Sequence, residues 1–193
     1  GLDPAAVREP ILEPSAADRE AAAAFVEKLG IRGPLIGLNT GAGGRWAYKQ
    51  WTKEHQQAFL RLCADAGIAV LLLGGPEEVL RHQDLLAYAA VMPVHDGGNH
   101  NSFGRFAALV DHCRVVVTGD SLAVHVAAAR RKPAVVLFGP TSAAEIELYG
   151  RGTKITPPGF DCLCCYLPRC DKVPHCQARI EPRVVLDAVQ RWL

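Results

Sequence analysis

Continuous runs of Val, Leu and Ile alternate along the chain with stretches whose apolar residues recur at helical spacing. An uninterrupted apolar run is typical of a strand buried on both faces, and strands separated by helices indicate a parallel sheet with right-handed crossovers. The runs that predict strands cover residues 34–40, 70–75, 91–98, 114–120 and 133–141. The pattern therefore predicts an α/β fold, a Rossmann-like parallel sheet of about five strands flanked by helices.

Helices are expected around these strands. They cover residues 15–29, 52–67, 76–90, 102–113, 121–131 and 182–193, with a short one at 143–150. After Gly150 the apolar pattern stops, and we expect no further strand. The chain is expected to divide into a linker and docking helix (1–33), a Rossmann-like domain (34–150), and a Cys-rich loop with a C-terminal helix packed on the same domain (151–193).

The composition argues against two classes of function, nucleic-acid binding and membrane insertion. The 193 residues are 49% hydrophobic, enough for an ordinary core, and 21 Lys and Arg nearly balance 20 Asp and Glu. Without a basic block, a nucleic-acid partner is not expected. No apolar run reaches the roughly 18 to 20 residues of a bilayer span, so we expect no transmembrane segment and a cytosolic protein. Because the chain opens with Gly1 instead of Met, we expect it to be a piece of a larger protein.

Gly stands next to hydroxyl or acidic residues after most of the expected strands. The connections contain NTGAGGRWAYKQW, GGPEE, DGGNHNS, TGDS and FGPTS, in chain order. Ligands of open parallel sheets bind at the carboxyl ends of the strands, and Gly-containing turns that open helices suit phosphate. Neither the G-x-G-x-x-G fingerprint nor a P-loop is present. A diphosphate-bearing ligand is the natural candidate.

Two titratable residues stand in an otherwise apolar run. Asp120 follows the fourth expected strand, and His125 lies five positions later in the following helix. Asp120 can act as the N-cap of that helix and His125 as a core histidine, or the two can serve a site at the sheet edge. Lys49 and Glu78 are likewise either a solvated lysine and a first-turn helix acid or functional residues.

Four segments carry a resemblance to a known family. GAGGRWAYKQWTKEH, LLLGGPEE, VVVTGDSLAVHVAAARRKPAVVLFGPT and the terminal Cys cluster with its last helix are similar to glycosyltransferase family 9. These heptosyltransferases move heptose from ADP-heptose onto the lipopolysaccharide core. The resemblance implies the C-terminal, nucleotide-sugar-binding half of a GT-B enzyme, with the acceptor site and catalytic base on a missing N-terminal domain. It also implies that this piece alone is inactive, and that the enzyme is cytoplasmic, peripheral at the inner membrane of a Gram-negative bacterium.

The resemblance implies roles for residues near the nucleotide of the donor. Lys49 would pair with the diphosphate and stabilise the leaving ADP in a metal-independent displacement, with no cofactor for catalysis. Glu78 would accept hydrogen bonds from the ribose hydroxyls, with Glu77 as a rival. Thr40, Ser121 and Thr141 would complete the substrate-binding set.

Two further residues belong to this implied site. Asp120, the second catalytic residue, would accept hydrogen bonds from hydroxyls of the donor. His125 would support the phosphates or orient Asp120. Family members commonly carry Gly where Leu122 stands, so the resemblance leaves a phosphate contact at that position open.

Five of the seven Cys lie within fifteen residues near the C-terminus. Cys162, Cys165, Cys170 and Cys176 offer four soft ligands, which suit a structural Zn or Fe ion. Reduced thiols packed in the tail, or disulfides formed on isolation, are the alternatives. Some members of the resembled family that glycosylate autotransporter proteins carry iron on a four-Cys motif, which keeps a protein acceptor open.

The leading hypothesis is therefore the donor half of a heptosyltransferase, with ADP-heptose as its ligand and the lipopolysaccharide core reached through the missing domain. One rival is another enzyme of nucleotide-diphosphate sugars, such as an epimerase or a protein heptosyltransferase. Preference for UDP-sugars would favour the epimerase. The other rival is a non-enzymatic, metal-stabilised assembly module, which predicts metal-dependent oligomerisation without nucleotide affinity.

Overall fold

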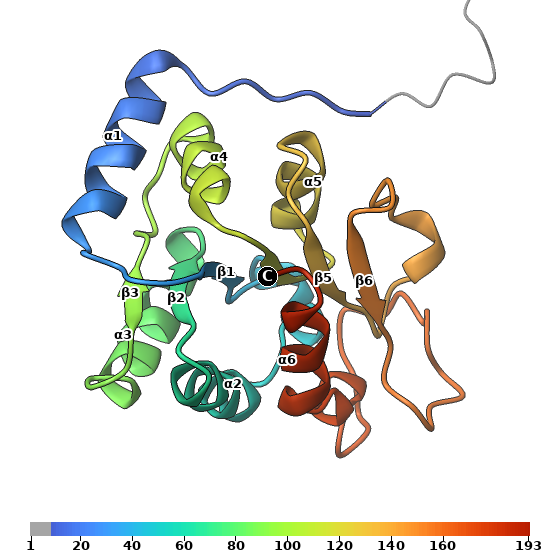
Figure 1. The fold of residues 1–193 in the computed structure, drawn as a ribbon. Helices are drawn as coiled ribbons and strands as arrows, with labels where there is room; N and C mark the ends of the chain where they lie inside the picture. The colour runs from blue at the N-terminus through green and yellow to red at the C-terminus, as the bar shows by residue number, and fades with distance from the viewer. Residues whose placement is uncertain (1–8) are drawn as a thin grey trace, which may run out of the picture.

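The computed structural model describes residues 9–193 and shows one sheet of six parallel strands (Figure 1). The strand order is β3-β2-β1-β4-β5-β6. The strands are β1 (Leu35–Asn39), β2 (Ala69–Leu73), β3 (Val94–Asp96), β4 (Val116–Gly119), β5 (Ala134–Leu137) and β6 (Gly152–Ile155). The α/β Rossmann-like fold is confirmed. The chain reverses its direction of travel across the sheet between β1 and β4, which is where ligands bind in such folds.

Helices cover both faces of the sheet (Figure 1). One face carries α1 (Ala16–Lys28), α4 (Phe103–His112) and α5 (Leu122–Ala129), and the other carries α2 (Lys53–Asp65), α3 (Val79–Tyr88) and α6 (Pro182–Gln190). Short 3-10 turns are η1 (Gly44–Lys49), η2 (Pro76–Glu78), η3 (Ala143–Glu145) and η4 (Cys176–Arg179). Within residues 9–193, no helix combines the length and apolar character of a membrane span. The first eight residues of the expected linker lie outside the described part of the chain.

Three helices begin where hydroxyl residues stand ahead of helical patterns. The side chains of Ser15, Thr52 and Ser102 each accept a hydrogen bond from the backbone N–H three residues later. Such a cap satisfies one of the N–H groups that the first turn leaves without a partner. The starts of α1, α2 and α4 are thus set by local sequence.

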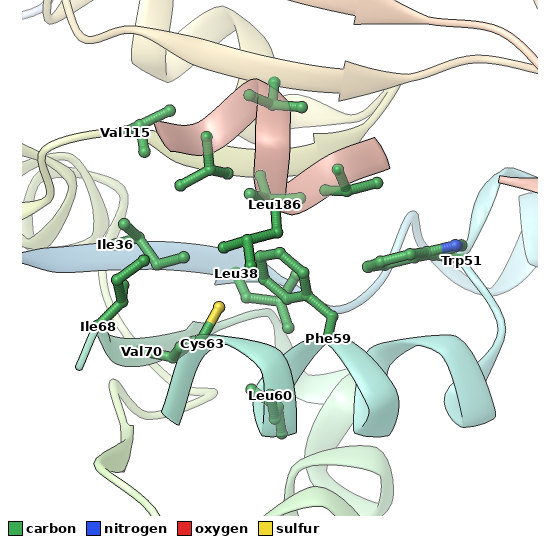
Figure 2. Close-up of a cluster of buried hydrophobic side chains, with 14 of the residues drawn as sticks. Ile36, Leu38, Trp51, Phe59, Leu60, Cys63, Ile68, Val70, Val115 and Leu186 are labelled. Atoms are coloured by element: carbon green, nitrogen blue, oxygen red, sulfur yellow. The ribbon is translucent and has the colours of Figure 1, made fainter. Parts of the chain in front are cut away.

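The sheet separates two apolar clusters, because neighbouring residues of a strand point to opposite faces. Figure 2 shows Ile36 and Leu38 of β1 in one cluster with Phe59 of α2 and Leu186 of α6. Leu35 of the same strand joins the other cluster, which packs under α1, α4 and α5. β1 is therefore buried on both faces, as its continuous apolar run predicts.

The expectation that no strand follows Gly150 is wrong. β6 pairs in parallel with β5 and forms an edge of the sheet. Its sequence, Gly-Thr-Lys-Ile, is only partly buried, so no apolar run marks it. An edge strand has one unpaired side, where polar and charged residues are common. The sheet therefore has six strands and extends into the segment expected to be a loop.

Candidate functional site

A cavity of about 810 Å³ opens at the carboxyl edge of the sheet. Its wall is formed by the turn after β1 (Gly41–Gly43), the turn after β2 (Gly74–Glu78), the loop after β3 (Asn99–Asn101) and the start of α5 (Ser121–Ala123). Four strand ends therefore meet there, at the point where the strand order reverses. The volume is in the usual range for small-molecule sites, roughly 300–1,000 Å³.

Glu78 is a buried acid in the wall of this cavity, with 6% of its surface exposed. Its Oε2 accepts a hydrogen bond from the backbone N–H of Gly75 at 2.8 Å. Its Oε1 is buried and has no hydrogen-bond partner among residues 9–193. A Cβ at Gly41 would lie 1.9 Å from this Oε1, so only Gly leaves room for the carboxylate. Glu77, the rival acid, is exposed.

The hydroxyl of Ser121 is occupied by local contacts. It accepts the N–H of Ala123 at 3.2 Å as the N-cap of α5, and it also accepts the Asn39 side-chain amide at 3.2 Å. The interpretation of Asp120 as the N-cap is therefore wrong. A cap holds the first turn of α5 at the cavity wall, where the partial positive charge of a helix N-terminus favours anions.

Lys49 and Asp120 lie 71 positions apart and form an ion pair, with 2.8 Å between Nζ and Oδ2. Each side chain is 14% exposed. A Cβ at Gly119 would lie 2.6 Å from the carbonyl oxygen of Lys49, so Gly permits the end of β4 to touch the η1 backbone. The structure thus brings the two predicted catalytic residues together, beside the cavity wall but outside the set of residues that line it.

The remaining predicted residues lie in different surroundings. Thr40 and Thr141 are buried, and neither hydroxyl has a hydrogen-bond partner in the described chain. Neither residue lines the cavity. His125 is exposed on α5. The interpretation of His125 as a core histidine is therefore wrong.

The loop after β3 contributes cavity residues that no motif singled out. The side-chain amide of Asn99 donates to the Gly75 carbonyl at 3.2 Å, and that of Asn101 donates to the carbonyls of Gly97 and Gly98 at 2.9 Å. Phe103, half exposed, stands at the first position of α4 in the same wall. The signal available in the sequence was Gly-Gly-Asn-His-Asn after a strand, which is typical of a turn with side-chain to backbone bonds.

The Cys-rich tail (residues 156–181) docks on the turn after β5. The N–H of Cys164 donates to the Gly139 carbonyl at 3.0 Å, and the N–H of Tyr166 donates to the Pro140 carbonyl at 2.8 Å. A Cβ at Gly139 would lie 2.5 Å from the sulfur of Cys176, so Gly allows this contact.

Three of the four predicted metal ligands act on the pKa of the fourth, Cys176. Burial raises the pKa of Cys176, and the charges of Cys170, Cys165 and Cys162 raise it further. All seven Cys are free thiols. Thiolate chemistry suits Zn or Fe. However, no three His, Cys, Asp or Glu side chains between residues 9 and 193 are gathered as an ion requires, so the arrangement does not fit a bound metal.

Comparison with known proteins places these features in context. The family model described as glycosyltransferase family 9 (heptosyltransferase) matches residues 4–166. Lipopolysaccharide heptosyltransferase 2 of Escherichia coli K12 is 32% identical over 114 residues, which are 56% of this chain and 32% of that protein. The solved structure of E. coli ADP-heptose lps heptosyltransferase II superposes on 98% of this chain with a TM-score of 0.76 at 23% identity.

The chain spans about half of the proteins whose fold it shares. It covers 55% of the E. coli heptosyltransferase II structure. It also covers 45% of the iron-containing dodecameric glycosyltransferase TibC from enterotoxigenic E. coli, which aligns with 84% of this chain at 14% identity and a TM-score of 0.61. At these identities the structural likeness shows the fold alone.

Proposed function

This chain belongs to glycosyltransferase family 9, and from that premise we propose that it is the donor-binding half of a heptosyltransferase that uses ADP-heptose. The acceptor of the proposed reaction is the lipopolysaccharide core, reached through a second domain that also carries the catalytic base. The site of action is the cytoplasm, peripherally at the inner membrane. Without the second domain, the chain binds the donor but does not transfer the sugar.

One observation carries the donor assignment: the cavity holds a buried carboxylate with a free oxygen beside Gly-rich turns. Oε1 of Glu78 has no hydrogen-bond partner in the described residues, and the missing side chain of Gly41 leaves it room. A buried acceptor without a donor is costly, and a ribose hydroxyl supplies the donor. The start of α5 lies in the same wall and favours an anion. A nucleoside diphosphate supplies both a ribose hydroxyl for Glu78 and a negative charge for the start of α5.

In the proposed reaction, a hydroxyl oxygen of the acceptor attacks the anomeric carbon of heptose. The bond from that carbon to the diphosphate oxygen breaks, the base of the second domain takes the hydroxyl proton, and ADP leaves with its negative charge. Lys49 stabilises this charge with a fixed ammonium. Asp120 accepts hydrogen bonds from sugar hydroxyls. Of the other residues that the resemblance assigns to the donor, Ser121 lies in the cavity wall, whereas Thr40, Thr141 and His125 do not line the cavity.

The proposed transfer needs no metal. TibC, which shares the fold, is an iron-containing glycosyltransferase, and the thiol chemistry of the tail in this chain is compatible with Zn or Fe. A structural metal in this chain would require the thiols to move closer together than they lie here. No step of the reaction depends on it.

The test is calorimetric titration of the chain with ADP, UDP, GDP and ADP-heptose. We expect ADP species to bind selectively, Lys49→Ala to weaken both ADP and ADP-heptose, and Asp120→Ala to weaken mainly ADP-heptose. Glu78→Gln should lower ADP affinity, whereas Glu77→Gln, the matched control at an exposed acid, should leave it nearly unchanged. Preference for UDP would instead favour another nucleotide-sugar enzyme. Absence of any nucleotide affinity would favour the assembly module, unless addition of the second domain restores it.

A further inference from the structure

Lys49 and Asp120 neutralise each other in this structure, yet the proposed function gives them separate tasks. Their charged atoms lie 2.8 Å apart, in side chains that are largely shielded from water. The diphosphate needs the ammonium group, and the sugar hydroxyls need the carboxylate. We therefore expect the bound donor to take over hydrogen bonds from both partners, so that the two move apart.

Trp46 provides the ammonium with a second contact. The Nζ of Lys49 lies 4.9 Å from the centre of the Trp46 ring. Trp46 and Lys49 are three positions apart in η1, but the backbone leaves helical geometry at Trp46 (φ −117°, ψ 51°), so the contact is established by the observed distance and not by regular helix spacing. The face of an indole attracts a cation without neutralising its charge. This contact therefore leaves the full charge of the ammonium to an anion, whereas the carboxylate of Asp120 offsets part of that charge.

The backbone around the pair is held by packing. The end of β4 touches the η1 backbone at Gly119, where a Cβ would lie 2.6 Å from the Lys49 carbonyl oxygen. The base of each side chain is thus fixed, and the position of the ammonium depends on its side-chain partners. When Asp120 releases it, Trp46 is the partner that remains. Arg45 lies over the same ring, with its guanidinium carbon 5.7 Å from the centre.

We propose that Trp46 is a positioning residue for Lys49: its ring holds the ammonium at the sheet edge while Asp120 exchanges from Lys49 to the hydroxyl groups of the donor. The inference rests on the proposed function, because it presupposes a diphosphate ligand. It assigns Trp46 a role through Lys49 and gives it no contact with the reacting atoms.

The test compares ADP with AMP, which differ by one phosphate, in calorimetric titrations of the full chain. The variants are Trp46→Leu and Trp46→Phe, each also made in a Lys49→Gln background. Trp46→Leu should lower ADP affinity about three- to tenfold and AMP affinity much less, and Trp46→Phe should restore most of the loss because it keeps an aromatic face. In the Lys49→Gln background, Trp46→Leu should not lower ADP affinity any further.

Asp120→Asn is a second test of the exchange of Asp120 from Lys49 to the donor hydroxyls. It should raise ADP affinity a few fold, because Lys49 is released, and this gain should vanish in the Lys49→Gln background. Equal ADP affinity of Trp46→Leu and the unchanged chain, or an equal loss in the two backgrounds, would overturn the proposal. If the unchanged chain binds neither nucleotide, and addition of the second domain does not restore binding, the proposed function itself fails. Thermal unfolding of each variant separates loss of folding from loss of affinity.

Discussion

The cavity and the Cys-rich tail are both built from turns at the carboxyl side of the sheet, but they differ in what holds them. The cavity residues come from four turns spread over more than eighty positions, and parallel strands bring those turns to one place. Five Cys lie within fifteen residues of the tail and are not gathered around one point. The five Cys are close in sequence but do not form a site. The cavity residues are far apart in sequence, and the strand ends bring them together.

The Cys-rich tail and the cavity turns also differ in backbone conformation. The tail contains Cys164 and Tyr166 with φ of 59° and 53°, a region that residues other than Gly seldom adopt. Each donates one backbone bond to the β5 turn, and the Tyr166 hydroxyl also accepts the Ser142 N–H at 3.2 Å. The cavity turns instead place Gly where another residue would collide, as Gly41 does beneath Glu78. The cavity is thus preorganised by packing, whereas the tail depends on a few contacts.

The largest expected effect tests the support beneath the cavity. Phe59→Ala removes a fully buried ring of α2 and should lower the free energy of unfolding by about 3–5 kcal/mol. Leu167→Ala, at a tail residue 58% exposed, should change it by less than about 0.5 kcal/mol. Chemical denaturation measures both. Similar losses in the two variants would show that the tail carries as much packing as the core.

The next effect tests the Gly turn itself. Gly41→Ala should lower ADP affinity at least about tenfold, because the new methyl group displaces the Glu78 carboxylate. Gly44→Ala is the matched control. Its Cβ would lie 3.2 Å from Oε2 of the exposed Glu77, which can move away. Calorimetry compares the two variants, and equal losses would mean that the position of Glu78 is not what binds ADP.

The pH dependence of stability tests the two thiols that are buried in the core. Burial raises the pKa of Cys63 and of Cys113 to about 12, from a value of 9.0. Because the folded chain keeps these protons longer than the unfolded chain, their contribution to stability is present below pH 9 and is lost as the pH rises towards 12. Cys63→Ala combined with Cys113→Ala should flatten this alkaline loss in denaturation experiments. An unchanged slope would contradict the assignment.

The smallest expected effect concerns the tail. Treatment with a chelator should leave ADP affinity within about twofold of its starting value, since no tail residue lines the cavity. Cys165→Ser, at an exposed thiol, should behave in the same way. Metal analysis accompanies the titrations. A bound metal whose removal lowers ADP affinity would show that the tail organises the site.

Much of the fold follows from the sequence because the interior strands are uniformly apolar and the helix starts carry hydroxyl caps. β6 could not be found in this way, since an edge strand is paired on one side only and its Thr153 and Lys154 carry no apolar signal. The loop after β3 is recognisable as a Gly turn, and Asn101 bonds within that loop, but the position of Asn99 depends on its bond to the Gly75 carbonyl in the turn after β2. Such bonds require the neighbouring turns to be in place.

By itself the sequence determined the layers of the fold and the chemical character of the strand ends, because apolar periodicity and turn residues act locally. The family resemblance of its motifs also predicted Lys49 and Asp120 as site residues. Only the tertiary structure decided that these two form one ion pair and that Gly41 leaves room for the buried carboxylate of Glu78. The physical reason is that such contacts join residues far apart in the chain, and they exist only when the parallel sheet has brought the ends of its strands together.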